Sequence, residues 1–235
     1  MDRKLEPEVM DTPEEAREYD EMDHGEVNRL FVDDLLSIGT VTGDFLDLGT
    51  GTALIPIELC ERVERCRVMA VDLSIEMLEL ARFRLEIAGL THRIQLDQVD
   101  SKAMPYDDGM FDLVMSNSII HHIPDPRIVI AEAIRVTKPG GRLFFRDLLR
   151  PQSEDELLRL VELHAGDENE SQKRLFAESL HAALTVEEFQ ELLDELGQSP
   201  AEVTASSDRH WTWATNMAGT LPENDNASED DPTIY

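Results

Sequence analysis

The segment Asp47-Leu48-Gly49-Thr50-Gly51-Thr52-Ala53 carries the clearest chemical signal in the sequence. Its two glycines allow a sharp turn and a close approach of the backbone to a ligand, where any Cβ atom would collide. The helix expected next would direct its amino-terminal N–H groups toward the same place. The carboxylate of Asp47 would repel a phosphate. The turn therefore favours a ligand with an ammonium group, or a bound water network.

A dinucleotide-binding turn would have the spacing G-x-G-x-x-G, and its third glycine would fall on Leu54. The observed spacing instead matches D/E-x-G-x-G-x-G, with Ala53 in the last position. That departure is mild because alanine is small. An NAD(P)-dependent oxidoreductase is therefore the weaker interpretation.

Two further carboxylates are expected at strand ends. Asp72 follows the glycines by about twenty residues, where an acidic side chain can accept hydrogen bonds from both ribose hydroxyls of a nucleoside. Asp100 and Ser101 end the next strand, and Met104 follows shortly after. That carboxylate is positioned to accept a hydrogen bond from an adenine amino group while apolar neighbours cover the ring.

These side chains must be positioned by alternating strands and helices. Glycine, proline and capping residues bound the helices, which run from Thr52 to Val63, from Ser74 to Gly89, and from Asp125 to Lys138. Short apolar runs predict five strands, at 45–48, 67–72, 94–100, 111–116 and 142–147. The pattern predicts an α/β fold with a mostly parallel sheet between two helical layers and ligands at the carboxyl ends of the strands.

The chain changes character at about residue 150. Helical signals alone follow until about residue 200, with capping boxes at Ser153/Glu156 and at Thr185/Glu188. We interpret residues 150–200 as a helical insert. Two late strands, at 201–205 and 210–215, are expected to be antiparallel.

The sequence divides into three parts. Residues 1–40 are interpreted as a helical lid, which includes Tyr19 and the apolar positions Phe31 and Leu35. Residues 41–217 form the α/β domain with its insert. Residues 218–235 are polar and acidic, and we expect them to form a disordered tail.

Composition excludes several classes of function. The formal net charge of −29 disfavours nucleic acids as substrates, since the basic residues are scattered. No apolar run is long enough for a membrane span and no signal peptide is recognisable, so a cytoplasmic protein is expected. Cys60 and Cys66 are interpreted as reduced thiols, and no metal site is expected.

The run from about Thr42 to Asp147 resembles the class I S-adenosylmethionine-dependent methyltransferases, especially the small-molecule branch with quinone methyltransferases. The motifs that carry the resemblance are DLGTGTA, AVDLS, QVDSKAMPY, FDLVMSNSIIHHIPDP and KPGGRLFFRDL. The resemblance implies a Rossmann-like three-layer sandwich with a seven-stranded, mostly parallel sheet and a reversed last strand. It also implies transfer of the methyl group of S-adenosyl-L-methionine to a small-molecule acceptor, with S-adenosyl-L-homocysteine as product.

The resemblance also suggests roles for individual residues. The expected contacts with the cofactor are Asp47, Gly49, Thr50 and Gly51 at the methionine end, Asp72 and Leu73 at the ribose, Asp100 and Ser101 at the adenine, and Asn117 through its backbone. His122 and Asp147 are the catalytic candidates. The candidates for the acceptor pocket are Tyr19, His121, Arg146, His210 and Trp211, which are chosen by their expected positions, since the lid and the segment 207–211 lie outside the shared core.

Some alternatives stay open at this point. In-line methyl transfer needs alignment above all, and a hydroxyl acceptor also needs a base. Asn117-Ser118-Ile119-Ile120 lacks the N/D-P-P-Y signature of nucleic-acid and glutamine amine methyltransferases, which disfavours that subclass. A protein that binds the cofactor without turnover is the main alternative, and a homodimer through the insert helices is one interpretation.

Overall fold

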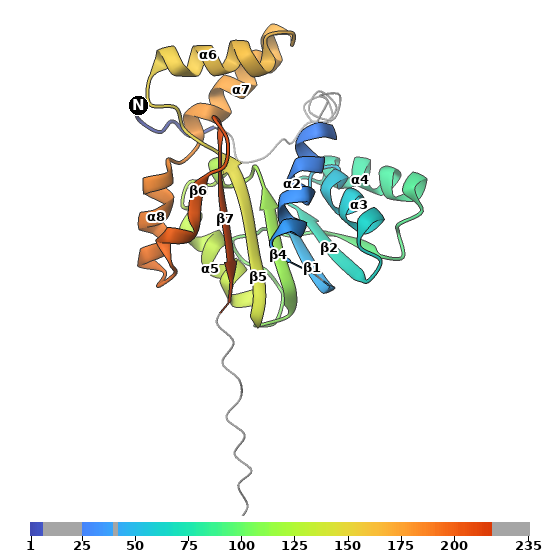
Figure 1. Cartoon of the computed structure of the whole chain (residues 1–235). Helices are drawn as coiled ribbons and strands as arrows, with labels where there is room; N and C mark the ends of the chain where they lie inside the picture. Colours follow the sequence, from blue (N-terminus) through green and yellow to red (C-terminus); the bar gives the residue numbers. More distant parts are fainter. Residues whose placement is uncertain (7–24, 40–41, 218–235) are drawn as a thin grey trace, which may run out of the picture.

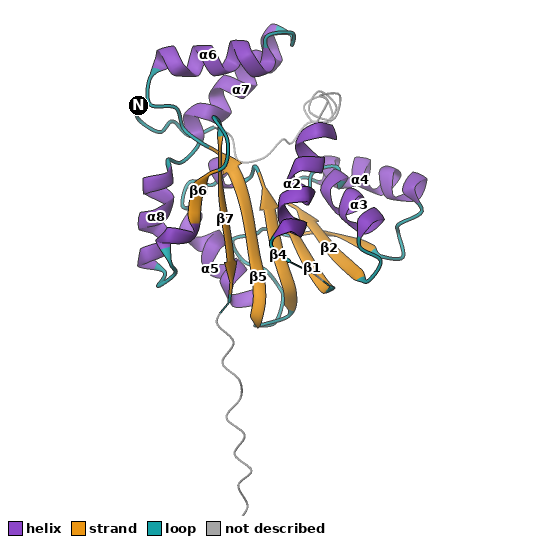
Figure 2. Cartoon of the chain, in the orientation of Figure 1, coloured by secondary structure: helices purple, strands orange, loops and turns teal. Residues whose placement is uncertain are grey.

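The computed structural model describes residues 1–6, 25–39 and 42–217 of the chain. Its centre is a seven-stranded sheet with the order β3-β2-β1-β4-β5-β7-β6 (Figures 1 and 2). The strands are β1 Gly43–Leu48, β2 Cys66–Asp72, β3 Ile94–Gln98, β4 Phe111–Asn117, β5 Thr137–Leu148, β6 Val203–Ala205 and β7 His210–Asn216.

Strand directions follow from the connections. Strands β1 to β5 pair in parallel because each is reached through a helix or a crossover on a face of the sheet. Strand β7 is antiparallel to both β5 and β6. The predicted mostly parallel sheet with a reversed last strand is confirmed.

One face of the sheet is covered by helices α2 (Gly25–Ser37), α3 (Leu54–Arg62) and α4 (Ile75–Ala88). Phe31, Val32 and Leu35 of α2 are fully buried against this face, and Phe31 meets Phe144 of β5 edge to face at 5.0 Å between ring centroids. Helix α4 begins at Ser74, whose side chain accepts a hydrogen bond from Met77 N–H. This layer fixes where β1 and β2 end.

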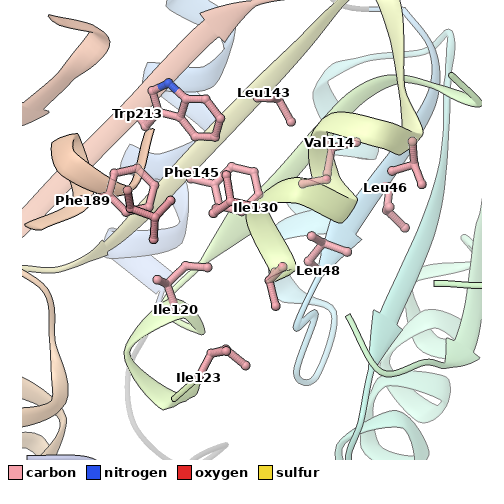
Figure 3. Packing of buried hydrophobic residues seen from close by; sticks show 14 of the residues in the cluster. Leu46, Leu48, Val114, Ile120, Ile123, Ile130, Leu143, Phe145, Phe189 and Trp213 are labelled. Carbon is pink, nitrogen blue, oxygen red and sulfur yellow. The ribbon is translucent and has the colours of Figure 1, made fainter. Parts of the chain in front are cut away.

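The opposite face is covered by helices α5 (Pro126–Val136) and α8 (Val186–Glu195). Figure 3 shows Ile130 of α5 and Phe189 of α8 packed over Phe145 and Trp213 of the sheet. Thr185 forms the predicted capping box with Glu188 at the start of α8. The buried apolar side chains of this layer hold β4 and β5 in register.

Helices α6 (Glu154–Ala165) and α7 (Glu170–Ala182) pack together beyond the carboxyl end of β5, where Leu148 contacts them (Figure 1). The amino-terminal residues 1–6 lie beside α7, and Lys4 N–H donates to the carbonyl oxygen of His181 at 3.1 Å. The insert therefore stands over the edge of the sheet at which ligands are expected.

Two predicted strand boundaries and one predicted capping bond were wrong. Strand β3 ends at Gln98, so Asp100 and Ser101 lie in the following turn. Strand β5 begins at Thr137, because Thr137 already pairs with Phe111 of β4, and the segment 138–141, in which Gly140 has a φ of +79°, forms an irregularity within the strand. Asp125 precedes α5 without a side-chain capping bond to the described residues, and its carboxylate pairs with Arg127 instead.

Within the part of the chain that the structure describes, no helix is long and apolar enough to cross a membrane. Tyr19 and the expected tail at 218–235 lie outside the described residues.

Candidate active site

An open cleft of about 770 Å³, its mouth included, lies at the carboxyl ends of β1, β2 and β4. The residues that line it are Gly49, Gly51, Asp72, Leu73, Ser74, Met77, Asp100, Ser101, Asn117, Ser118, Ile119, His122 and Ile123. Eight of these were predicted from the sequence as site residues, and the structure brings them together.

The glycine turn is built as its sequence requires. Gly49 and Gly51 have φ angles of +68° and +54°, in the left-handed region that glycine enters without strain. A Cβ atom at Gly49 would lie 2.1 Å from Cγ2 of Ile119 on the opposite wall. Ala53 also has a positive φ, of 61°, a backbone conformation that is strained for a residue with a Cβ atom and that a third glycine would adopt freely.

Asp72 ties this turn to the end of β2. Its Oδ2 accepts a hydrogen bond from Gly51 N–H at 2.8 Å, and its Oδ1 accepts one from Ser74 N–H at 2.9 Å. Burial raises the pKa of Asp72, although these backbone donors act in the opposite direction. The carboxylate therefore positions the turn and also lines the cleft beside it.

Asp47 lies behind the turn, buried within the end of β1. Burial raises the pKa of Asp47 to about 7, and the nearby Asp72 carboxylate adds to the rise. A nearby cation would stabilise the ionised form of this carboxylate. Asp47 and the buried Thr50 support the cleft, and neither belongs to its lining.

Asn117 ends β4 on the far side of the glycine turn and lines the cleft. Its Oδ1 atom is buried and has no hydrogen-bond partner among the described residues. A buried polar atom without a partner is costly, and a ligand with a donor group would satisfy it. The next residue, Ser118, has a φ of 59°, which is strained for a residue other than glycine.

These observations test the fit of an adenosyl amino acid to the cleft. Two glycines leave space for close approach, Asp72 provides acceptor oxygens, and Asn117 has an unsatisfied buried amide oxygen. Apolar side chains at Leu73, Met77 and Ile119 suit a ring system. The residues present fit such a ligand.

Three predicted acceptor residues lie away from the cleft. Arg146 is buried and pairs with Asp34 at 2.6 Å, which ties α2 to β5. Trp211 stacks on Phe189 at 4.1 Å between ring centroids, inside the core. His210 accepts or donates a hydrogen bond at Ser207, and burial lowers its pKa to about 4. The side chains of Arg146, Trp211 and His210 therefore contact other parts of the protein and do not line the cleft.

The two histidines divide between the core and the cleft. His121 is buried, and its Nδ1 lies 2.6 Å from Oδ1 of Asp147, whereas His122 lines the cleft. Burial alone would lower the pKa of His121, but the Asp147 carboxylate raises it above its ordinary value. Burial would raise the pKa of Asp147, which His121 and two backbone N–H groups hold below its usual range. Of the two predicted catalytic residues, only His122 lines the cleft. Asp147 contacts His121, so it can affect His122 only through that neighbouring ring.

Sequence reasoning missed Glu6 near these histidines. Its Oε1 lies 3.3 Å from Nε2 of His121 and 3.2 Å from Nδ1 of His122. It is separated from them by more than a hundred residues, and no local pattern signals the approach. Ser74, Met77, Ser118, Ile119 and Ile123 were also missed, although all five follow predicted strand ends closely.

The sheet order, the glycine turn after β1 and the acidic end of β2 define a Rossmann-like fold of the class I methyltransferase type. A family model described as "Methyltransferase domain" matches residues 46–145. This match over residues 46–145 agrees with the resemblance seen in the motifs of the sequence.

Similar proteins agree with this assignment. The chain is 30% identical over 182 residues to the 27-O-demethylrifamycin SV methyltransferase of Amycolatopsis mediterranei, covering 76% of this chain and 63% of that protein. It is 35% identical over 111 residues to the demethylmenaquinone methyltransferase of Lactobacillus johnsonii, covering 46% of each. The chain thus spans about half to three fifths of the length of these curated relatives.

A solved structure shares the fold. A candidate S-adenosyl-L-methionine-dependent methyltransferase of Methanococcus maripaludis superposes with a TM-score of 0.69 at 22% identity, over 94% of this chain and 99% of that one. At 22% identity, this similarity shows only that the two proteins share a fold.

Proposed function

We propose that the chain is an S-adenosyl-L-methionine-dependent methyltransferase that acts on a small-molecule acceptor. One observation carries the proposal. The cleft combines the glycine turn, the Asp72 carboxylate and the unsatisfied buried oxygen of Asn117 at the switch point between β1 and β4. The methyltransferase domain match supports it, as do the names of the two relatives, which act on a rifamycin and on demethylmenaquinone.

Each part of the cleft has a role in this proposal. Gly49 and Gly51 contact the methionine end, Asp47 and Thr50 support that contact from behind the turn, and Asp72 with Leu73 holds the ribose. Asp100 and Ser101 bind the adenine, and Asn117 bonds the ligand. When bound, the cofactor supplies a methyl group activated by its sulfonium sulfur. The protein's contribution is alignment and exclusion of water, and alignment alone is worth roughly 7–11 kcal/mol in well-oriented systems.

The acceptor is expected on the side of the cleft that His122 and Ile123 line. His122 is the imidazole that can contact the acceptor there, and it is the candidate to take a hydroxyl proton. Asp147 is a positioning residue, because it holds His121, whose ring lies 4.2 Å from that of His122 between centroids. The acceptor is an uncharged or cationic small molecule rather than a nucleic acid, given the net charge of −29.

The remaining parts of the proposal concern organisation. Residues 1–40 act as a lid, and α2 is its docked end, held by the Arg146 to Asp34 pair. The protein acts in the cytoplasm, and a homodimer would use the exposed apolar residues Leu158 and Leu163 of α6.

Two measurements test the proposal. Calorimetric titration with S-adenosyl-L-methionine and with NADH separates a methyltransferase from an oxidoreductase, and we expect binding of the first alone. Release of S-adenosyl-L-homocysteine with a panel of phenols, quinols and macrocyclic alcohols then separates an enzyme from a binding protein that lacks turnover. Failure to bind the methyl donor in the folded protein would overturn the proposal.

A further inference from the structure

Three side chains from distant parts of the sequence converge beside the acceptor end of the cleft. They are Glu6, His121 and His122, whose Oε1, Nε2 and Nδ1 atoms lie within 4.8 Å of one another. Two of these atoms are imidazole nitrogens and one is a carboxylate oxygen. This is the ligand type that zinc and neighbouring transition metals prefer.

The spacing of these atoms fits a shared ion. Tetrahedral zinc with ligands at 2.0–2.1 Å places any two ligand atoms about 3.3 Å apart. The Glu6 Oε1 atom lies 3.3 Å from His121 Nε2 and 3.2 Å from His122 Nδ1. Neither contact has the geometry of a hydrogen bond, since Oε1 is buried and has no hydrogen-bond partner within the described segments. The carboxylate oxygen is therefore at a ligand's distance from both nitrogens and unsatisfied.

Partners behind the cluster orient two of its members. His121 Nδ1 lies 2.6 Å from Asp147 Oδ1, which leaves its Nε2 directed toward Glu6. The other oxygen of Glu6, Oε2, accepts a hydrogen bond from Ser179 at 3.2 Å. A carboxylate that holds the distal nitrogen of a histidine is the usual partner of a metal-binding imidazole.

The segment that carries Glu6 is itself fixed. Arg3 donates to the carbonyl oxygens of His121 at 3.1 Å, Ile123 at 3.0 Å and Ala182 at 2.6 Å. Glu6 is brought to the histidines by this anchoring, and its side chain is 8% exposed. With Asp147 it gives the pocket two carboxylates, a charge that suits a divalent cation.

We propose that Glu6, His121 and His122 bind one Zn²⁺ ion, and that the fourth position, for which the described residues supply no ligand, faces the cleft that His122 lines. Three protein ligands and one open position are the arrangement of catalytic rather than structural zinc sites. Mg²⁺ and Ca²⁺ are disfavoured, because they require mostly oxygen ligands. The open position is available to water or to an oxygen of the acceptor, and this last point rests on the proposed methyl transfer. His122 is then a metal ligand and not the base.

The test uses the full, untagged chain after removal of metals. Titration with Zn²⁺ against a competing chromogenic chelator is expected to give one bound ion per chain. Co²⁺ in its place is expected to give the strong visible absorption of a four-coordinate ion. Glu6→Gln and His122→Gln should each weaken binding at least tenfold, and Asp147→Asn, which removes the orienting partner, roughly 10- to 100-fold.

Two controls protect this interpretation. Glu154→Gln changes a carboxylate that also lies near a histidine, 3.5 Å from His181 Nε2, but that is 66% exposed. It should leave Zn²⁺ affinity unchanged. Cys60→Ser removes one of two buried thiols whose sulfur atoms are 3.6 Å apart, the other soft-metal candidate, and should also leave affinity unchanged. Loss of binding in Cys60→Ser would overturn the proposal.

These measurements distinguish a failure of the zinc site from a failure of the proposed function. Folding of each variant is checked by thermal unfolding, and Glu6→Gln should also retain the parent's affinity for S-adenosyl-L-homocysteine while it loses zinc. Equal zinc affinity in Glu6→Gln and the parent would refute the site and leave the methyl-donor assignment standing. In that case the contacts of Glu6 are ion pairs with a protonated imidazole. A parent that binds zinc but no methyl donor would support the metal site and overturn the proposed function.

Discussion

The Nδ1 atom of His121 and the Oδ1 atom of Asp147 are 2.6 Å apart, with both side chains buried at the end of β5. Asp147 also accepts the backbone N–H groups of Ile120 and Leu148. Three donors thus point at one carboxylate, which provides only acceptors. The contact fixes the His121 ring in the wall behind the cleft.

Asp147→Asn should destabilise the protein, because one oxygen becomes an NH₂ group that faces a donor in either orientation. We expect the free energy of unfolding to fall by about 2–4 kcal/mol, given about 1–3 kcal/mol for each unsatisfied buried group. Denaturant unfolding measures it. Asp208→Asn is the matched control, since Asp208 pairs with His164 at 3.0 Å on the surface. It should cost less than about 1 kcal/mol.

Asp72→Ala should weaken the binding of S-adenosyl-L-homocysteine about 100-fold or more, because two charge-assisted hydrogen bonds to the ribose are lost. Calorimetric titration measures this affinity. Asp107→Ala, at an exposed position outside the cleft, should bind as the parent does. Equal affinities in the two variants would contradict the role of Asp72.

Three glycine variants separate backbone strain from contact with the ligand. Gly197→Ala should cost about 1–2 kcal/mol of stability from its φ of +69° and leave affinity unchanged. Gly51 has a similar φ of +54°, and the described residues leave open space around an added Cβ atom. Gly51→Ala should therefore lower the free energy of unfolding by the same amount, but it should also abolish ligand binding.

Gly49→Ala adds a clash with Ile119 to that strain. It should lower the free energy of unfolding by about 2–5 kcal/mol and also abolish ligand binding. Thermal unfolding and calorimetry together measure these effects. A Gly51→Ala variant that binds normally would show that the turn does not approach the ligand.

The pH dependence of binding should report on Asp47. Its pKa is raised to about 7, so it is protonated in the free protein below that pH, and a ligand ammonium group favours its ionised form. Affinity should therefore rise up to about tenfold from pH 6 to pH 8. The stability of the free protein should change in the opposite sense.

A folded-state pKa above the unfolded value stabilises the protonated state, so the free energy of unfolding should fall by up to about 4 kcal/mol as pH rises from about 4 to 7. Asp47→Asn should remove both pH dependences. Calorimetry across pH and denaturant titrations measure them, and an unchanged profile in the variant would exclude Asp47 as their source.

Trp211→Ala should unfold more easily by about 3–5 kcal/mol, because it empties a site in the core that is fully buried and stacked on Phe189. Trp211→Phe should cost much less. In both variants the KM for an acceptor should stay at the parent value. A raised KM with unchanged stability would instead make Trp211 part of the acceptor pocket.

The α/β fold and most of the cofactor cleft could be predicted from the motifs and their spacing along the chain. Asp72 and Asn117 end parallel strands, Gly49 and Gly51 directly follow one, and parallel strands bring those ends to one edge. Local pattern suffices there, because the spacing along the chain sets the spacing in space.

The acceptor side could not be predicted in this way, because its contacts join elements that are distant along the chain. Glu6 meets His121 through a contact across more than a hundred residues, and Arg146 and Trp211 have partners on α2 and α8. Which histidine bonds Asp147 depends on the turn of a single 3₁₀-helical segment, Ile120–His122. Such contacts arise from the packing of elements that no local periodicity links, so adjacent residues with the same side chain receive different roles.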